Sequence, residues 1–117
     1  MVVRKSELNK RPVGEGDWPS NLCRSLWHDV LAGREATVEV RARVRLASWH
    51  AVTSAVQAVD LVDLTGGATS LYATCPIERA FRDVHAITQH IGVHPRILET
   101  AGRVLFGLEP DIPVLML

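Results

Sequence analysis

The chain has 117 residues and 47% hydrophobic residues, enough for one domain with a buried core, and this composition excludes disorder for most of its length. Thirteen basic and thirteen acidic residues give a net charge of zero, so we expect neither a nucleic-acid partner nor a membrane partner. The two cysteines form no disulfide framework and no signal peptide is visible, so the sequence predicts a cytoplasmic protein.

The first 33 residues predict a flexible arm followed by a helix. Residues 1–16 are polar and punctuated by proline and glycine, which is typical of a poorly ordered terminus. Asp17 is a suitable helix cap with Pro19 in the first turn, and Gly33 is a suitable stop. Between them the apolar residues recur at helical spacing: Leu22, Leu26, Trp27, Val30 and Leu31.

Residues 35–65 carry two different patterns. Apolar and charged residues alternate over 37–46, as in a half-buried strand, whereas from Leu46 onward the spacing is helical and ends at Gly66-Gly67. No glycine or proline separates the two patterns. We therefore predict one long helix, with an extended conformation of 37–45 as the alternative.

Two further helices follow. Pro76 opens the third, whose apolar stripe runs to Ile91 before Gly92 interrupts it, and Pro95 opens the fourth, which closes at Gly107. The predicted fold is all-α, an up-and-down four-helix bundle over residues 17–109 with a C-terminal tail at 110–117.

Ionisable residues are densest at 79–90. Arg79 and Asp83 are four residues apart and can pair on one helix face, and His90 lies two turns beyond Asp83 on nearly the same face. The structural interpretation is a solvated face with one ion pair. The functional interpretation is that His90 projects into a cleft as a base or hydrogen-bond donor. A metal site built from His85, His90 and His94 is a weaker hypothesis, and we expect no metal.

Residues 59–109 carry a resemblance to a known family. Its motifs are Gly66-Gly67 at the end of a long helix, Pro76 after a short link, Arg79-x-x-Arg82-Asp83, a histidine seven residues later (His90), and the ending GRVLFGLEPD at 102–111. This run resembles the C-terminal helical domain of acyl-CoA dehydrogenase-like flavoproteins, most closely the flavin-dependent two-component monooxygenases.

The resemblance implies a FAD or FMN cofactor and roles for six residues. His90 matches the histidine that faces flavin and substrate, where it deprotonates or orients a phenol-like substrate or supports the oxygen-activating flavin. Arg82 and Asp83 match a pair that organises this helix near the cofactor. The turn near the flavin, which in tetrameric relatives is often close to a neighbouring subunit's cofactor, is matched by Gly66, Gly67 and Ser70.

The complete enzymes of this family are several times longer and include an N-terminal helical domain and a middle β domain that this chain lacks. We therefore expect a stand-alone or truncated C-terminal domain of an oxidoreductase that is inactive alone, because oxygen activation by reduced flavin needs a dry pocket. Its expected partners are copies of itself, in a dimer or tetramer, or a complementary flavoprotein subunit. The alternative is a non-catalytic helical oligomerisation module that packs through Trp18, Trp27 and Trp49.

Overall fold

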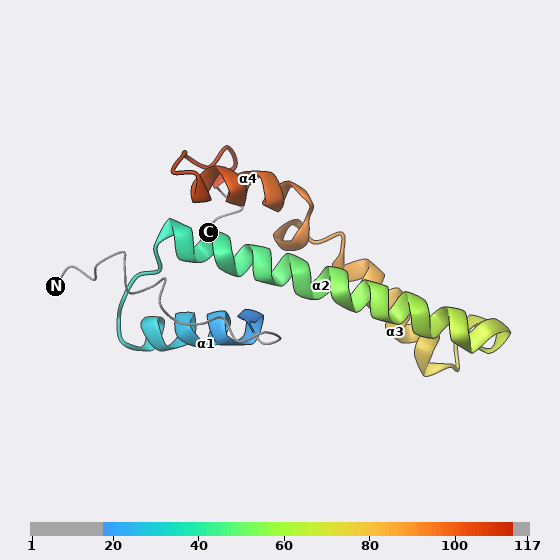
Figure 1. Cartoon of the computed structure of the whole chain (residues 1–117). Helices are drawn as coiled ribbons and strands as arrows, with labels where there is room; N and C mark the ends of the chain where they lie inside the picture. The colour runs from blue at the N-terminus through green and yellow to red at the C-terminus, as the bar shows by residue number, and fades with distance from the viewer. Residues whose placement is uncertain (1–17, 114–117) are drawn as a thin grey trace.

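The computed structural model describes residues 18–113, which form helices and no strand. In chain order these are α1 (Trp18–Leu31), α2 (Val38–Gly66), the 3-10 helix η1 (Gly67–Leu71), α3 (Pro76–Ile87), the 3-10 helix η2 (Ile91–Val93) and α4 (Arg96–Leu105) (Figure 1). The all-α class and the four predicted helices are confirmed. The predicted arm at 1–16, the cap Asp17 and residues 114–117 lie outside the described residues.

The long helix α2 is the spine of the fold. Its 29 residues span about 43 Å at 1.5 Å per residue. Thr37 caps its first turn by accepting a hydrogen bond from the Val40 backbone N–H at 3.3 Å, and Arg43 donates to Glu39 at 2.8 Å one turn along the helix. The extended alternative for 37–45 is thereby excluded, since a good cap and an uninterrupted helix outweigh the local alternation.

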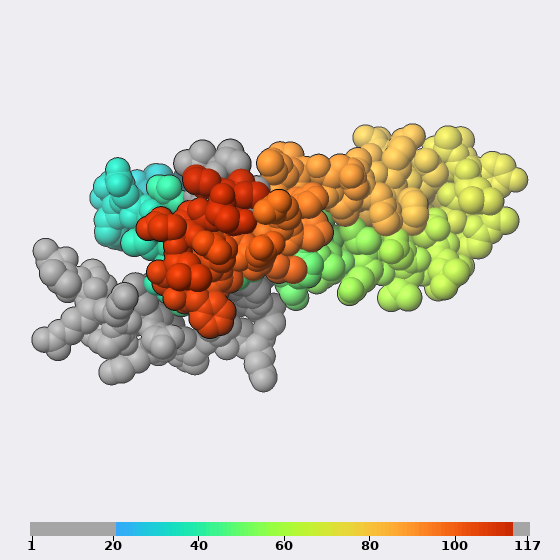
Figure 2. Space-filling view, turned by 90° about the horizontal axis from the view of Figure 1, so that it is seen from above, coloured from blue at the N-terminus to red at the C-terminus, as the bar shows by residue number. Residues whose placement is uncertain are grey.

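The other three helices pack on α2. In Figure 1, α1 and α4 lie beside its first half, and α3 runs back along its second half. The extents of 59 × 30 × 24 Å and the radius of gyration of 17.6 Å describe an elongated molecule, because a compact domain of about 100 residues has a radius near 13 Å. Figure 2 shows the second half of α2 and α3 as an arm that projects from the rest.

The core lies at the first half of α2, where α4 crosses it. Ala42 of α2 and Ile97 and Ala101 of α4 are completely buried, because the small alanine side chains let the two helices approach closely. Three partly buried side chains pack around them: Leu46, Val104 and Ile112. This core is small for a chain of this length.

Many apolar side chains of the described residues remain exposed. Phe106, Leu71 and Leu64 are 87%, 80% and 78% exposed, respectively. Single exposed apolar residues are ordinary, but a set of this size is typical of surfaces that contact other protein. The remaining exposed members of the set are Trp27, Val30, Leu31, Val38, Leu61, Val62, Tyr72, Ile87, Ile91, Leu98, Leu105 and Leu108.

Candidate functional site

The candidate site is the corner where the chain leaves α3, passes through η2 and enters α4 against the middle of α2 (Figure 1). Helix α3 ends at Ile87, and the next residue, Thr88, donates its hydroxyl to the His85 carbonyl at 2.6 Å; η2 begins at Ile91. The prediction that α3 continues to Ile91 is therefore wrong, and so is the placement of His90 on the same helix face as Asp83. The Thr88 hydroxyl bond does not by itself account for this end, since Ser48 and Thr53 make similar bonds to backbone carbonyls within the uninterrupted α2.

His90 is exposed and forms the N-cap of η2. Its Nδ1 accepts a hydrogen bond from the Gly92 backbone N–H at 3.0 Å. Gly92 is buried, and a Cβ atom built on it would lie 3.0 Å from His90 Nδ1 and 3.1 Å from Nη1 of Arg45 on α2. His90, Gly92 and Arg45 thus meet at one point, although 45 residues separate Arg45 from His90.

Two open hollows flank this corner, and Gln89 and His94 line both of them. The larger, of about 410 Å³, lies in the range of small-molecule pockets. Its other lining residues are Trp49, Val52, Thr53, Val56, Thr88, Val93 and Pro95. The smaller, of about 270 Å³, is completed by Ile91, Arg96 and Ile112.

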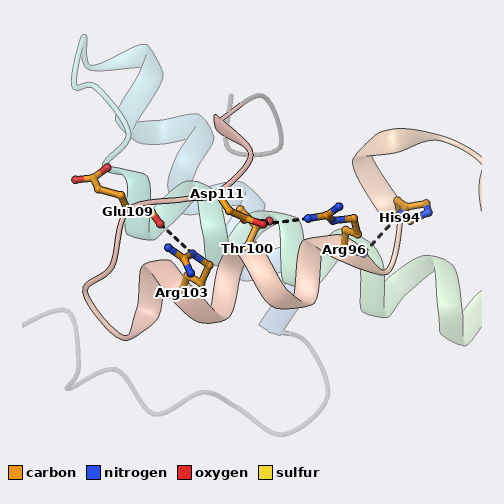
Figure 3. A network of polar contacts seen from close by, with 6 residues as sticks. All are labelled: His94, Arg96, Thr100, Arg103, Glu109 and Asp111. Carbon is orange, nitrogen blue, oxygen red and sulfur yellow. Dashed lines mark hydrogen bonds and ion pairs between the residues drawn. The ribbon is translucent and has the colours of Figure 1, made fainter.

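A polar network on α4 fixes one wall of the smaller hollow (Figure 3). Asp111 accepts hydrogen bonds from Thr100 Oγ1 at 2.7 Å and from Arg96 Nη2 at 3.2 Å. The hydrogen bond from Thr100 is the main cause that holds the pKa of the Asp111 carboxyl below its ordinary value; burial opposes it and Arg96 adds to it. The network brings the chain after α4 back onto the helix, so that Ile112 reaches the core.

Arg82 and Asp83 form ion pairs within α3 and not with each other. Arg82 Nη1 lies 3.8 Å from Glu78 Oε1, and Asp83 Oδ2 lies 3.5 Å from Arg79 Nε, which confirms the predicted pairing of Arg79 with Asp83. All but Glu78 are well exposed. Both residues are available on the surface of α3, and their role near a cofactor stays a prediction.

Gly66, Gly67 and Ser70 form the turn at the far end of α2. Gly67 adopts φ 56°, a backbone conformation suited to glycine, and the buried Ser70 hydroxyl donates to the Gly67 carbonyl at 2.7 Å. The 12 residues of α3, about 18 Å of helix, separate this turn from His90. The structure therefore does not bring the predicted flavin residues together, and their contact with flavin stays a prediction.

One polar contact that the sequence did not single out joins α3 to α2. His85 Nε2 donates to Asp60 Oδ1 at 2.8 Å, and the His85 ring contacts the Phe81 ring in a tilted arrangement, with 4.4 Å between the ring centroids and 44° between the planes. From the sequence, His85 is considered only as a ligand in the weaker hypothesis of a metal site. Asp60 lies 25 residues earlier, so only the fold reveals the pair.

Arg45 and Gln89 were also missed as site residues. Arg45 lies one turn before Trp49 on the stripe of α2 that faces the corner, so a charge on an otherwise apolar stripe was the available signal. The alternation of charged and apolar residues at 37–46 concealed it, because that pattern predicts a half-buried strand with its arginines on the solvated face.

Among residues 18–113 no three His, Cys, Asp or Glu side chains lie close enough to hold a metal ion together. Nδ1 of His94 accepts a hydrogen bond from the Arg96 N–H at 3.3 Å, as Nδ1 of His90 does from Gly92. The weaker hypothesis of a site shared by His85, His90 and His94 is therefore not supported. No helix in the described part of the chain is both long and apolar enough to cross a membrane.

Comparisons with known proteins match most of the chain. A sequence profile described as "Acyl-CoA dehydrogenase, C-terminal domain" matches residues 20–95, well over half of the chain. Indole-3-acetate monooxygenase of Acinetobacter baumannii is 35% identical over 122 residues, which cover 93% of this chain and 31% of that protein. The oxygenase subunit HsaA of a flavin-dependent monooxygenase from Mycobacterium tuberculosis is 36% identical over 80 residues, covering 68% of this chain and 20% of that subunit.

A solved structure matches the fold as well. The crystal structure of the HsaA monooxygenase from M. tuberculosis superposes with a TM-score of 0.70 at 30% identity, covering 81% of this chain and 25% of that one. The chain spans less than a third of the length of the curated relatives it matches. These matches confirm the resemblance predicted from residues 59–109.

Proposed function

Because the chain belongs to the acyl-CoA dehydrogenase C-terminal domain family, we propose that it acts as the C-terminal helical domain of a flavin-dependent, two-component monooxygenase. The proposed reaction is hydroxylation of an aromatic substrate, and the relatives whose names describe monooxygenases support this class. Reduced FAD or FMN, when bound, supplies the electrons that activate oxygen.

The observation that carries this proposal is the position of His90. It is exposed at the corner between α3 and α4; its neighbour Gln89 lines both hollows, whereas His90 itself lines neither. The larger hollow suits an aromatic ring system, because Trp49, Val52 and Val56 give it an apolar wall and Thr53 adds a hydroxyl. In this proposal His90 contacts flavin and substrate and orients the substrate, and Arg82 and Asp83 lie beside the cofactor.

We further propose that this chain is inactive alone. Both hollows are open, and a site for oxygen chemistry must exclude water from the reacting atoms. The missing walls then come from other protein, either in a longer chain or in a complementary flavoprotein subunit.

Association with copies of this chain, as a dimer or tetramer, is proposed on the distribution of exposed apolar residues. Leu61, Leu64, Leu71 and Tyr72 surround the turn at Gly66-Gly67, at the free end of the α2–α3 arm. A neighbouring subunit that covered them would also bring its cofactor near this turn. The same exposed surface favours the second candidate function, a non-catalytic oligomerisation module.

Fluorescence titration with FMN and FAD, oxidised and anaerobically reduced, tests the flavin proposal. We expect saturable micromolar binding that Arg82→Ala and His90→Ala each weaken about tenfold or more. Arg34→Ala is the matched control, since Arg34 pairs with Asp29 next to α1, away from the corner. Absence of binding in every state, also with a candidate partner subunit present, would contradict the flavin role.

Light scattering after size-exclusion chromatography separates the two candidate functions. A dimer or tetramer without flavin binding supports the oligomerisation module, whereas flavin binding supports the monooxygenase domain. We expect Leu64→Asp and Leu71→Asp to lower the oligomeric state, because both place a charge on the exposed apolar end. Ala58→Asp, an exposed change on the same helix one to two turns earlier, is the control for added charge. A wild-type monomer would contradict self-association.

A further inference from the structure

The hydrogen bond between His90 and Gly92 determines which ring nitrogen of His90 carries a hydrogen. The Gly92 backbone N–H can only donate, so His90 Nδ1, 3.0 Å away, must offer its lone pair. A neutral imidazole has one hydrogen on its two nitrogens. That hydrogen therefore lies on Nε2.

Gly92 is the residue that makes this contact possible. A Cβ at this position would lie 3.0 Å from Nδ1 and 3.2 Å from Cε1 of the ring, closer than carbon atoms usually approach. It would also lie 3.1 Å from Arg45 Nη1. The ring and the guanidinium group of Arg45, which belongs to α2, thus border the space that a side chain at Gly92 would enter.

We propose that Gly92 is a positioning residue that holds His90 in the Nε2–H form, so that His90 acts as a hydrogen-bond donor and not as a general base. A base at Nε2 would need the hydrogen on Nδ1, where it would point at the Gly92 N–H and break the bond. His90 is exposed, so an acceptor atom of a bound molecule can reach the ring. The donor role rests on the proposed function of His90, whereas the positioning by Gly92 does not.

Nuclear magnetic resonance on the 15N-labelled chain tests the positioning directly. Scalar coupling across a hydrogen bond between the Gly92 amide nitrogen and His90 Nδ1 is expected, together with a long-range proton–nitrogen pattern of the Nε2–H form. His90→Ala identifies the histidine signals. The absence of the coupling, or a hydrogen on Nδ1, would overturn the proposal.

Gly92, which is buried, and Gly102, which is half-buried, provide a matched pair of positions for alanine substitution. Gly92→Ala is expected to weaken the coupling, because the added methyl group would displace the ring or the Arg45 side chain. Gly102→Ala, whose Cβ would have no atom within 4 Å, is expected to leave it unchanged. A coupling of the same size in Gly92→Ala and wild type would contradict the steric argument. If Gly92→Ala does not fold, the wild-type coupling and the variants below decide the question.

Two variants that are isosteric with each other, His90→Asn and His90→Asp, distinguish a hydrogen-bond donor at position 90 from a general base. Asn and Asp at position 90 both cap η2 through a side-chain oxygen, but only Asn keeps an N–H donor. With FMN as the probe, we expect His90→Asn to bind within about threefold of wild type and His90→Asp to bind about tenfold more weakly. Equal weakening by both would contradict the donor role. If wild type binds no FMN while the Gly92 coupling is present, the proposed function fails and the positioning by Gly92 stands.

Discussion

Thr100 and Asp111 face each other across the turn that follows α4, and the Thr100 hydroxyl donates to the Asp111 carboxylate at 2.7 Å (Figure 3). Thr100 is completely buried, so its hydroxyl depends on this partner. The pair fixes the chain beyond α4 to the same helix that supplies Ile97 to the core. The sequence predicts a separate C-terminal tail at 110–117. In the structure the start of this segment packs against α4 through Asp111 and Ile112.

The Asp111 carboxylate predicts a loss of stability in acid. Its pKa is lowered from the ordinary 3.8, chiefly by Thr100, so its contribution is present above pH 3.8 and is lost as the pH falls through the lower folded-state value. Thermal unfolding measured from pH ~6 to ~2.5 should show a smaller acid-induced drop for Asp111→Asn than for wild type. Asp83→Asn, which removes a more exposed carboxylate on α3, controls for net charge. Identical pH profiles for Asp111→Asn and wild type would contradict the prediction.

The position of the core predicts that alanine substitutions at two neighbouring residues of α4 lower the free energy of unfolding by very different amounts. Ile97 is completely buried and Leu98 is 41% exposed. Ile97→Ala should lower the free energy of unfolding by about 2–5 kcal/mol through lost burial and a cavity, and Leu98→Ala by much less. Urea unfolding followed by circular dichroism measures both. Equal losses would mean that the core does not lie between α2 and α4.

Alanine substitutions at two glycines should change the stability of the fold in opposite directions. Gly67 has φ 56° and ψ −141°, a region that alanine enters at a cost of about 1–3 kcal/mol, so Gly67→Ala should destabilise the fold. Gly102 lies inside α4 with open space around its Cβ position, so Gly102→Ala should stabilise the fold by about 1 kcal/mol. Paired thermal denaturation of the two variants is the measurement. A stabilising Gly67→Ala would contradict the backbone conformation at the end of α2.

The contact between His85 and Asp60 predicts a modest coupling between α2 and α3. Their side chains are 39% and 48% exposed, and pairs this exposed contribute about 0.2–1 kcal/mol. A double-mutant cycle with His85→Gln and Asp60→Asn measures the coupling free energy. Strictly additive effects would show that the 2.8 Å contact adds no stability.

The helices were predictable from the sequence because local signals and the fold agree in them. Pro76 and Pro95 mark the starts of α3 and α4, and the long stripe to Gly66 marks α2. The end of α3 was missed because the apolar stripe continues through Ile91, whereas α3 ends at Ile87, the Thr88 hydroxyl bonds back to the His85 carbonyl and His90 caps the separate helix η2. Apolar spacing carries no record of such hydroxyl and imidazole contacts.

The candidate site was predictable only where its residues belong to one short motif. His90 was singled out by its distance from Asp83, but its ring bonds to the Gly92 backbone and lies near Arg45, which comes from another helix. The distance between His90 and the Gly66-Gly67 turn also follows from the fold and not from the motif. The sequence shows which residues lie near one another along the chain, whereas the packing of the helices decides which residues come into contact in space.

Buried side chains are distributed unequally along α2, and this distribution predicts which helices unfold locally. Helix α4 contributes three completely buried residues, whereas α3 has none. Amide hydrogens of α3 and of the last turns of α2 should therefore exchange with solvent through partial opening, while those at the α2–α4 crossing exchange only on global unfolding. The α2–α3 arm is therefore the segment that a neighbouring protein can stabilise against local opening. Binding to the arm would slow amide hydrogen exchange in α3 before it changed exchange at the core.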